Sequence, residues 1–557
     1  MDIKEFTMTE INNLLEEFGE RELSPIEQLR DAVLERIEYF KTDEGFAYGK
    51  YVLENGQAVT ARLESKQFKH FVRRVARELG ISPSPTYINT AVEEVQAQAD
   101  ISAQKAVYLR SAWVDNQIHY FTGTMEAPAY TVIDVPSGTV SAIGSSPIEY
   151  LPNPDYRQMN LALGQNKSSD EIIEILKKYL NVEDEQNLYL IIVWLCSALV
   201  PESSWQYPQL NFVAGKGSGK TTGMEFCRKI VDLQKESLII FPSGIGVEKA
   251  TENLFVQAHS NWTLPYDNVT SFGINLAMVL SVFTTGANVL MRKKYSDLDV
   301  ISMSAKRPII LNYISQPHSR SDLMDRSIVI QFKALTGIRE DDQTMRANME
   351  IDLPIIRAFI FETLAKALHL MKTEPVEINR ADRWRITQFY KLGRHIEKVL
   401  NWKEGTFHNA IWEATNNQAL VLLQNDEIAI GIKDLTSDWA EGQIEKYTPT
   451  NLFNAIKANY RNSTDDNDTE KLSWWARKTV PVFSRDLQNI KDELKLYGLK
   501  LLYQHSGNRL WIIEKLTYSE TPVQPDQTNN LDGSDTTIDI RNLDDDPHDL
   551  YEQGLLE

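Results

Sequence analysis

One stretch, NFVAGKGSGKTTGMEF at residues 211–226, constrains the fold of this chain more than any other. A short apolar strand leads into a glycine- and serine-rich turn, and a lysine, two threonines and a helix follow. The spacing is that of a phosphate-binding loop, with Ala214 where the first glycine usually stands. The alternative is a glycine-rich turn that only caps an ordinary helix. The flanking strand and helix favour the phosphate loop, and with it an α/β core.

Each residue type in this loop suits a bound nucleotide. Glycines let consecutive backbone N–H groups converge on phosphate oxygens, and the helix beginning near Lys220 adds the positive end of its dipole. We expect Lys220 to reach the β- and γ-phosphates and the Thr221 hydroxyl to bind Mg²⁺, so ATP and Mg²⁺ are the expected cofactors. The residues assigned to the nucleotide are Ala214, Gly215, Lys216, Gly217, Ser218, Gly219, Lys220, Thr221 and Thr222.

Two predicted strands after the loop end in polar residues. NWTLPYDN ends at Asp267 and Asn268, and an acid at this place is expected to hold Mg²⁺ through water. KRPIILN ends at Asn312, whose side chain can sense the γ-phosphate. Asp267 and Thr221 are therefore the metal-binding candidates, and Lys220, Asp267 and Asn312 are catalytic candidates.

Two arginines precede a further predicted strand, in RSDLMDRSIVIQF at residues 320–332. From this position Arg326, or Arg320 in its place, could reach the nucleotide of a neighbouring subunit. An arginine there would stabilise the negative charge of the transition state, so both are catalytic candidates.

At this point the sequence resembles a known family. The run TTGANVLMRKKYSDLDVISMSAKRPIILNYISQPHSRSDLMDRSIVIQF at 284–332 is similar to the core of superfamily-3 helicases, ring-forming AAA+ ATPases that include poxvirus-type primase-helicases. The wider chain looks most like helicase-like ATPases of bacterial prophages and integrative elements. The residues that match the family pattern are Thr285, Gly286, Arg292, Tyr295, Asn312, Asp322, Asp325 and Arg326.

The resemblance implies a hexamer with a nucleotide at each subunit boundary and a DNA-gripping hairpin in the central pore. In this chain the hairpin corresponds to LMRKKYSDLD at 290–299. Adjacent bases beside an aromatic ring also suit a loop that tracks a nucleic-acid backbone. The DNA-binding candidates are Arg292, Lys293, Lys294 and Tyr295. The alternative is an exposed charged turn.

Two features depart from the family pattern. Asp267 is followed by Asn268 rather than by a glutamate, and an asparagine can orient a water molecule but cannot accept its proton. Asn268 is included among the catalytic candidates on this basis. Pro265 stands inside the predicted strand, where it removes a hydrogen bond of the ladder. A nucleotide switch that hydrolyses slowly therefore stays open as an alternative.

Composition bounds the setting. A length of 557 residues suggests three or four domains. Two cysteines, Cys196 and Cys227, exclude a disulfide framework and a cysteine-based zinc site. The longest apolar run, LYLIIVWLCSALV, is too short to span a bilayer. We expect a soluble protein of the bacterial cytoplasm, encoded by a phage or mobile element, without a membrane partner.

The net charge of −20 argues at first against a nucleic-acid partner. Half of this charge lies in residues 519–557, which have the composition of a disordered acidic tail. The rest of the chain is still acidic, so contacts with DNA must come from local patches. One candidate patch is a predicted helix over 65–79, which carries bases on one face and apolar residues on the other. An ordinary solvated face is the preferred interpretation, and phosphate contact is the alternative.

A separate small domain is expected at 446–517. Its pattern is a helix at TPTNLFNAIKANYR, a helix from Ser484 to Gly498, and a hairpin that turns at 506–508. Helix, helix, hairpin is the order of a winged helix, which binds DNA in some proteins and other proteins in others. The bases that could meet phosphates are Arg485, Lys491, Lys495 and Arg509.

The expected fold is therefore a multidomain α/β protein around an AAA+ core with a parallel sheet. The expected layout is an N-terminal α+β domain (DNA-binding or ring collar) at 1–165, a helical linker at 166–204, the ATPase core at 205–345, helices at 346–445, a winged-helix-like domain at 446–517 and an acidic tail at 518–557.

The expected function is that of an ATP-dependent hexameric DNA helicase or translocase for replication of a phage or mobile element. Its partners would be single-stranded or forked DNA, further copies of itself, and a separate primase, polymerase or single-strand-binding protein. Two alternatives remain: a regulatory or defence switch that unwinds nothing, and a replication initiator whose ATPase controls assembly.

Overall fold

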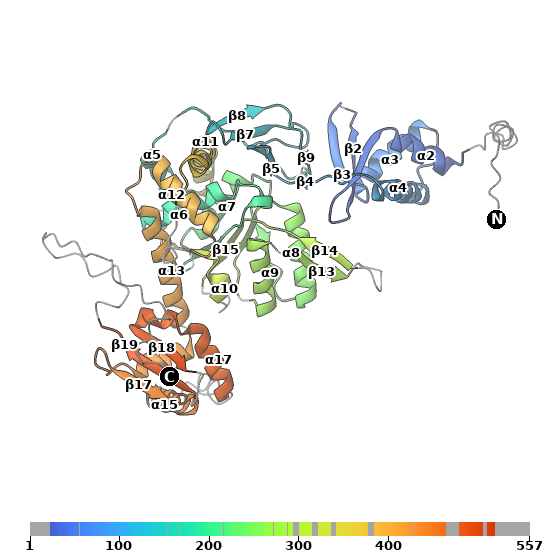
Figure 1. Ribbon diagram of the computed structural model, residues 1–557. Helices are drawn as coiled ribbons and strands as arrows, with labels where there is room; N and C mark the ends of the chain where they lie inside the picture. Colours follow the sequence, from blue (N-terminus) through green and yellow to red (C-terminus); the bar gives the residue numbers. More distant parts are fainter. Residues whose placement is uncertain are drawn as a thin grey trace, which may run out of the picture. The chain divides into compact units, whose positions relative to one another are not determined.

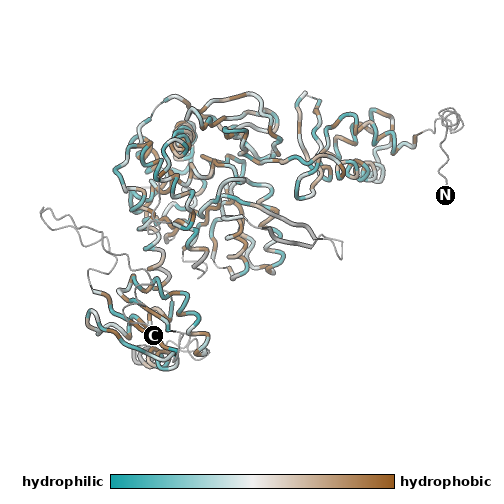
Figure 2. Tube along the Cα trace, viewed as in Figure 1, coloured by the Kyte–Doolittle hydropathy of each residue, from teal (hydrophilic) through white to brown (hydrophobic). Residues whose placement is uncertain are grey.

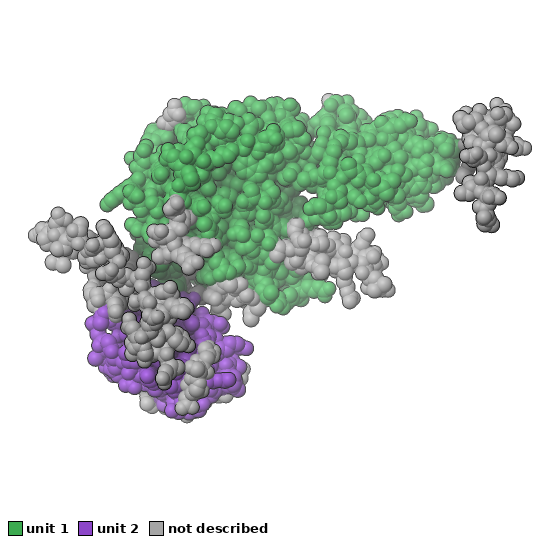
Figure 3. All heavy atoms as spheres, in the orientation of Figure 1, with its two compact units in different colours: residues 1–422 green, residues 423–557 purple. Residues whose placement is uncertain are grey.

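The computed structural model divides into two compact units, Met1–Leu422 and Leu423–Glu557 (Figure 3). Each unit is described by itself. The residues that the structure describes are 23–54, 56–151, 153–165, 167–215, 217–270, 272–286, 288–292, 300–314, 321–335, 341–376, 384–424, 426–463, 478–504 and 509–517.

A five-stranded parallel sheet lies at the centre of the first unit (Figure 1). The strand order is β11-β12-β15-β10-β16, so β15 lies between β10 and β12, although it follows both in the chain. The strands are β10 Gln209–Val213, β11 Ile239–Ile240, β12 Leu264–Asp267, β15 Ile309–Tyr313 and β16 Ser327–Gln331.

Helices cover both faces of this sheet. One face packs against α6 Glu185–Ser197, α7 Lys220–Val231, α11 Asp342–Thr373 and α12 Thr387–Val399. The other packs against α8 Val247–Ser260, α9 Ile274–Thr285 and α10 Ser321–Met324. The expected α/β class, a parallel sheet with flanking helices, is confirmed.

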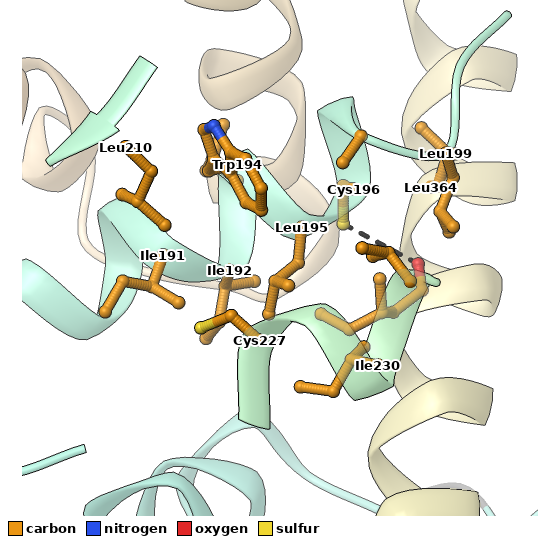
Figure 4. Close-up of a cluster of buried hydrophobic side chains, with 14 of the residues drawn as sticks. Ile191, Ile192, Trp194, Leu195, Cys196, Leu199, Leu210, Cys227, Ile230 and Leu364 are labelled. Carbon is orange, nitrogen blue, oxygen red and sulfur yellow. Dashed lines mark hydrogen bonds between the residues drawn. The ribbon is translucent and has the colours of Figure 1, made fainter. Parts of the chain in front are cut away.

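The core beside α6 and α7 contains both cysteines (Figure 4). Cys196 Sγ lies 3.6 Å from the carbonyl oxygen of Ile360, and Cys227 packs near Ile192 and Ile230. Both thiols are fully buried, and burial raises the pKa of each well above its usual value. They behave as apolar core residues with thiols that stay protonated.

The expected N-terminal domain at 1–165 divides between two cores. Residues 23–105 have a core of their own, built from α2 Pro25–Leu34, α3 Lys66–Glu78, α4 Pro85–Asp100 and the antiparallel strands β1 Ile37–Lys41, β2 Ala47–Val52 and β3 Ala58–Arg62. Apolar and polar stretches alternate along these helices (Figure 2). The strands β2 and β3 form a hairpin, and Gly56 between them has a φ of +81°. Asn-Gly, the pair at 55–56, is a strong sequence signal for such a turn.

Residues 107–150 belong instead with the central sheet. The strands β4 Val107–Tyr108 and β9 Glu149–Tyr150 pair with each other, and a four-stranded antiparallel sheet is formed by β5 Ser111–Val114, β6 Gln117–Phe121, β7 Tyr130–Asp134 and β8 Thr139–Ile143. Ile118, Tyr120 and Ile133 of that sheet share the core of α6, α7 and α11. Residues on both sides of the expected boundary at 165 therefore share this core.

A buried ion pair fastens this antiparallel sheet to α7. Arg110 and Asp232 are both fully buried, and Arg110 Nε lies 3.0 Å from Asp232 Oδ1. Arg110 also donates to the carbonyl oxygens of Phe121 and Leu233, and its guanidinium carbon lies 3.4 Å from the ring centroid of Tyr156. Burial raises the pKa of Asp232, but Arg110 and Arg228 outweigh this and hold it below its usual value.

Pro265 proves compatible with its strand. Leu264 donates its N–H to Pro308, on the β15 side, so the nitrogen of residue 265 faces the opposite way. On that side β11 pairs only with Tyr266 and Asp267. The missing N–H of Pro265 therefore costs no hydrogen bond of the ladder.

After the last strand of the sheet, the chain continues with the helices α11, α12 and α13 Thr406–Gln424. A further helix, α5 Ser169–Tyr179, comes before α6. The helix α11 contains Pro354 in its interior. Among the described residues, none of the helices has both the length and the apolar character needed to cross a membrane.

The second unit contains α14 Glu427–Leu435, α15 Pro449–Ser463, α17 Val480–Ile490 and a three-stranded sheet in the order β17-β19-β18. The strands are β17 Ile444–Tyr447, β18 Leu499–Gln504 and β19 Leu510–Lys515, all antiparallel to their neighbours. Because α14 and β17 belong to this unit, it begins before the expected residue 446.

The helix predicted from Ser484 to Gly498 is wrong in its bounds. The helix α17 begins at Val480, with Pro481 in its first turn, and ends at Ile490. A 3₁₀ helix follows at Glu493–Tyr497 and ends at Gly498, which has a φ of +70°. Ser484 does not cap the helix but accepts a hydrogen bond of 3.0 Å from the indole of Trp511.

Candidate nucleotide-binding site

The loop between β10 and α7 has the backbone that its glycines predict. Gly217 and Gly219 have φ values of +75° and +83°, in the left-handed region that favours glycine. A Cβ on Gly215 or Gly217 would have no atom within 4 Å, so the loop presents bare backbone. Such a loop at the start of a helix fits the phosphates of a nucleotide. Lys216 lies outside the described residues.

Lys220 is the first residue of α7 and lies under this loop. Its Nζ donates to the carbonyl oxygens of Ala214 at 2.6 Å and Gly215 at 2.9 Å, and it lies 3.4 Å from Ser218 Oγ. Only 7% of Lys220 is exposed. Burial lowers the pKa of its ammonium, and the nearby charge of Asp267 partly offsets this. Three acceptors around the ammonium keep a positive charge at the loop.

Three polar side chains meet beside Lys220. Thr221 Oγ1 lies 3.1 and 3.3 Å from the two carboxylate oxygens of Asp267. Asn312 Nδ2 donates to Thr221 Oγ1 at 3.3 Å and also to Asp267 Oδ1. Thr221 is exposed, whereas Asn312 is 2% exposed. A hydroxyl and a carboxylate at this separation are oxygen ligands of the kind that Mg²⁺ prefers.

The strand order explains why these residues meet. Because the strands are parallel, the ends of β10, β12 and β15 lie at one edge of the sheet, which we call the carboxyl edge. Insertion of β15 between β10 and β12 brings Asn312 between the phosphate loop and Asp267. Ligand sites of open α/β sheets lie at this edge. Thr222 follows in the first turn of α7 and is half-buried.

Asn268 was expected to orient a water molecule, and in the structure it contacts the carboxylate of Asp267. Its φ of +53° lies in the left-handed region, which asparagine tolerates better than most residues. Its backbone N–H donates to Asp267 Oδ1 at 3.0 Å, and its side-chain amide lies 3.4 Å from Asp267 Oδ2. Asn268 therefore orients the carboxylate of Asp267 directly.

Sequence reasoning missed Asn181, in the turn between α5 and α6. Its side-chain amide donates to the carbonyl oxygen of Lys333 at 2.7 Å and lies 3.4 Å from that of Ser218 in the loop. A bridge between Val182 and Phe332 holds the same two segments together. No local pattern signals Asn181, because its partners are far away in the sequence.

Gly223 is a sequence signal that α7 packs closely against another part of the chain. It lies inside α7, where glycine is unfavourable. A Cβ there would come within 3.0 Å of Phe332 and 3.1 Å of Leu180. A larger residue at this position would therefore require the Phe332 and Leu180 side chains to shift by a few tenths of an ångström.

Arg326 lies at the other end of the sheet. It immediately precedes β16, where Ser327 pairs with Gln209 at the start of β10, while Gln331 pairs with Val213 next to the loop. The four intervening steps separate the two ends by about 13 Å. We call this end of the sheet the amino edge. The structure does not bring Arg326 to the Lys220 of its own chain, and Arg320 lies outside the described residues.

Two paired strands flank the residues expected to form the pore hairpin. The strands β13 Asn288–Arg292 and β14 Val300–Ser304 pair antiparallel, with Arg292 opposite Val300. The hairpin follows α9 through Gly286, which has a φ of +80°. The side chain of Arg292 and residues 293–299, which include Lys293, Lys294 and Tyr295, lie outside the described residues. Within the described ranges, no cluster of three or more histidine, cysteine or acidic side chains could hold a metal ion.

Comparison with known proteins gives one family match. Residues 173–398 match the family model "Actinomycete integrative conjugative element replication protein". This span runs from within α5 to the end of α12 and contains the whole site at the carboxyl edge. Comparison with curated proteins gives no match.

Comparison with solved structures gives matches of low identity and low TM-score. One described as "SCCmec type IV Cch - active helicase" is 11% identical, with 86% of this chain and 93% of that chain covered and a TM-score of 0.42. The NrS-1 C-terminal region (305–718) is 10% identical, with 88% and 99% covered and a TM-score of 0.36. A JCV helicase is 14% identical, with 42% and 65% covered and a TM-score of 0.21.

Proposed function

We propose that this chain is an ATP-hydrolysing replication protein of a mobile genetic element, and that it moves along DNA as a hexameric ring. The observation that carries the proposal is the meeting of Thr221, Asp267 and Asn312 beside the Lys220 ammonium. The family match at 173–398 supports the setting in a mobile element. The insertion of β15 between β10 and β12 supports the superfamily-3 AAA+ type of core.

The residues at the carboxyl edge have separable roles in this proposal. The loop 214–219 and Lys220 would hold the phosphates of ATP, and Thr221 and Asp267 would hold Mg²⁺. Bound Mg²⁺ would neutralise charge on the phosphates. Asn312 would position the Asp267 carboxylate and the Thr221 hydroxyl, and Asn268 would fix the other side of that carboxylate.

Arg326 would complete the site of a neighbouring subunit. Its distance from its own phosphate loop, about 13 Å along the strands, supports action on another chain. The hairpin of β13 and β14 would place Arg292, Lys293, Lys294 and Tyr295 on a DNA strand in the ring's pore. An acidic chain can bind DNA in this way because a ring gathers one basic hairpin from each subunit.

The second unit supports a winged-helix interpretation. The order α14, β17, α15, α17, β18, β19 gives helices followed by a hairpin, with β17 as a third strand. Arg485 is paired with Asp486 at 3.4 Å, which weakens its case as a phosphate contact. Lys491, Lys495 and Arg509 remain the proposed contacts with DNA.

The test is steady-state ATP hydrolysis by the wild type and by Lys220→Ala, each with and without single-stranded DNA. We expect DNA to stimulate the wild type strongly and Lys220→Ala to lose hydrolysis. Strand displacement on a forked duplex then separates a helicase from an initiator whose ATPase only controls assembly.

A nucleotide switch is the second candidate, and Asn268 is the observation that favours it. No carboxylate follows Asp267, and Asn268 is occupied in holding Asp267. Tight ATP binding with negligible turnover that ignores DNA would overturn the motor and favour the switch.

A further inference from the structure

The helix α3 presents two very different faces. Its buried side chains pack in the core of residues 23–105; they are Phe68, Phe71, Val72, Val75 and Ala76. On the opposite side Lys66, Lys69, Arg73 and Arg77 follow one another at intervals of three and four residues, so they form a single stripe. Lys66 and Arg77 are exposed, and Lys69 and Arg73 are half-buried. We call these four residues the α3 stripe.

The bases of α3 divide by whether the protein neutralises them. Arg74, which lies off the stripe, is 3.6 Å from Glu54 and 3.8 Å from Glu78, and it donates to the carbonyl oxygen of Val52. By contrast, none of the four stripe residues forms an ion pair with any described residue. What distinguishes the stripe is that four bases without an ion pair to a described residue follow one another along one face of a single helix.

Repulsion between the positive charges of the stripe destabilises α3, and an anionic ligand would relieve it. Lys69 and Arg73, and Arg73 and Arg77, are like charges four residues apart, and each such pair destabilises a helix by a few tenths of a kcal/mol. From Lys66 to Arg77 the stripe extends about 16 Å along a straight helix. A rigid row of cations fits a ligand with a rigid row of anions.

The phosphates of duplex DNA match this surface best. A duplex carries one negative charge per about 1.7 Å of its axis, and it is stiff over the length of the stripe. Proteins that bind single strands combine basic residues with exposed aromatic side chains for stacking, whereas the aromatic residues of α3, Phe68 and Phe71, are buried in the core. Contacts with the backbone alone position a protein on DNA without reading its sequence.

We propose that the α3 stripe binds the phosphate backbone of duplex DNA, as a contact separate from the nucleotide site and from the β13–β14 hairpin. It requires neither ATP nor the hairpin, and so it goes beyond the proposed function. In this proposal residues 23–105 hold the chain on duplex DNA.

The test is binding of the full chain to a short blunt-ended duplex without nucleotide, measured by fluorescence anisotropy over a series of salt concentrations. The test variant is Lys66→Ala/Lys69→Ala/Arg73→Ala/Arg77→Ala. A second test variant, Lys69→Ala/Arg73→Ala, removes only two of the four charges. Its control is Lys235→Ala/Lys403→Ala, which removes two exposed lysines outside the stripe that form no ion pair with described residues. Thermal melting checks that each variant is folded.

We expect the slope of log affinity against log salt to fall by about four for the quadruple variant and about two for the pair variant. The affinity of the quadruple variant at low salt should fall at least about tenfold, and the matched control should behave as the wild type. DNA-stimulated ATP hydrolysis on single strands should be unchanged by the quadruple variant. Conversely, Lys220→Ala should still bind the duplex, so the two proposals fail separately.

An unchanged salt slope in a folded quadruple variant would overturn the proposal. So would equal competition from polyglutamate of the same total charge, because the stripe would then be a surface for acidic protein segments rather than for DNA.

Discussion

The two edges of the central sheet both carry candidate catalytic residues, but only at the carboxyl edge does one chain bring several of them into contact. At the carboxyl edge, Lys220, Thr221, Asp267 and Asn312 are within hydrogen-bonding distance of one another or of the loop. At the amino edge, Arg326 belongs to no such group around the phosphate loop of its own chain. A parallel sheet separates these edges by the length of its strands. One chain can therefore bring together the residues of the carboxyl edge, while Arg326 lies about 13 Å along the strands from the phosphate loop of its own chain. In the proposed function Arg326 acts on a second chain.

The largest predicted effect comes from the amino edge. Arg326→Ala should lower kcat for ATP hydrolysis by about 10³-fold or more, because an arginine acting in trans stabilises transition-state charge. Nucleotide affinity should change little, since the carboxyl edge is intact. Single-turnover hydrolysis measures the rate of the chemical step, and equilibrium nucleotide binding measures the affinity. Arg385→Ala, on the half-exposed arginine 3.7 Å from Asp325 beside Arg326, is the matched control and should keep most activity.

Mixing inactive variants tests the comparison itself. Lys220→Ala and Arg326→Ala subunits combined in equal amounts should recover about a quarter of wild-type sites, because a site needs an intact loop from one chain and an intact arginine from the next. Mixtures as inactive as the separate variants would break the assignment of Arg326 to the neighbouring site.

Asn312 should come next in size. Asn312→Ala removes the donor to Thr221 Oγ1 and to Asp267 Oδ1 at a position that is 2% exposed. We expect kcat to fall by about 10²-fold, with KM changing much less, because positioning matters most in the transition state. Steady-state measurement of kcat and KM distinguishes a role in the transition state from a role in nucleotide binding alone. A rise in KM at constant kcat would mean that Asn312 serves binding alone.

A packing change behind the loop should affect stability. Gly223→Ala adds a Cβ within 3.0 Å of Phe332 and 3.1 Å of Leu180, and overpacking of this kind costs about 1–3 kcal/mol. The free energy of unfolding should fall accordingly in denaturant titration. Thr222→Ala, one residue earlier in α7 and half-buried, is the control for the effect of a small residue there. Equal stability of Gly223→Ala and the wild type would show that Leu180 and Phe332 move aside freely.

The smallest predicted effect is at Asn268. Asn268→Gly suits the φ of +53° and keeps the backbone N–H that donates to Asp267 Oδ1. If the side chain only steadies Asp267, hydrolysis should stay within about threefold of the wild type and the free energy of unfolding within about 0.5 kcal/mol. Loss of hydrolysis comparable with that of Asn312→Ala would give the Asn268 amide a direct role in orienting water.

Much of the carboxyl edge was predictable because it is encoded locally. The phosphate loop, the strand ending at Asp267 and the strand ending at Asn312 each have their own short pattern, and the β2–β3 hairpin was likewise visible in Asn55-Gly56. Whether these residues perform the chemistry stays a prediction. The α/β class followed from the strand, loop and helix at 211–226.

Other features depend on distant partners. Asn181 contacts Lys333 across 152 positions, and no window of sequence contains both. The antiparallel sheet at 111–143 was expected to belong to an N-terminal domain at 1–165, yet it shares apolar side chains with the core of α6, α7 and α11. The break after Ile490 was missed because apolar spacing continues through a 3₁₀ segment almost as it does through an α-helix.

The ion pair between Arg110 and Asp232 sets the shortest fragment worth expressing. A fragment limited to the matched span 173–398 would include Asp232 but not Arg110, and would leave Arg228, 3.7 Å away, as the remaining counter-charge of the buried carboxylate. Removing one partner of a buried ion pair destabilises the fold. It would also expose the face of α11 that β7 and β8 cover. A truncation that begins just ahead of Val107 keeps both. A stable fragment that carries the candidate nucleotide site therefore begins earlier than the matched span 173–398, by the length of a sheet that carries none of the site's residues.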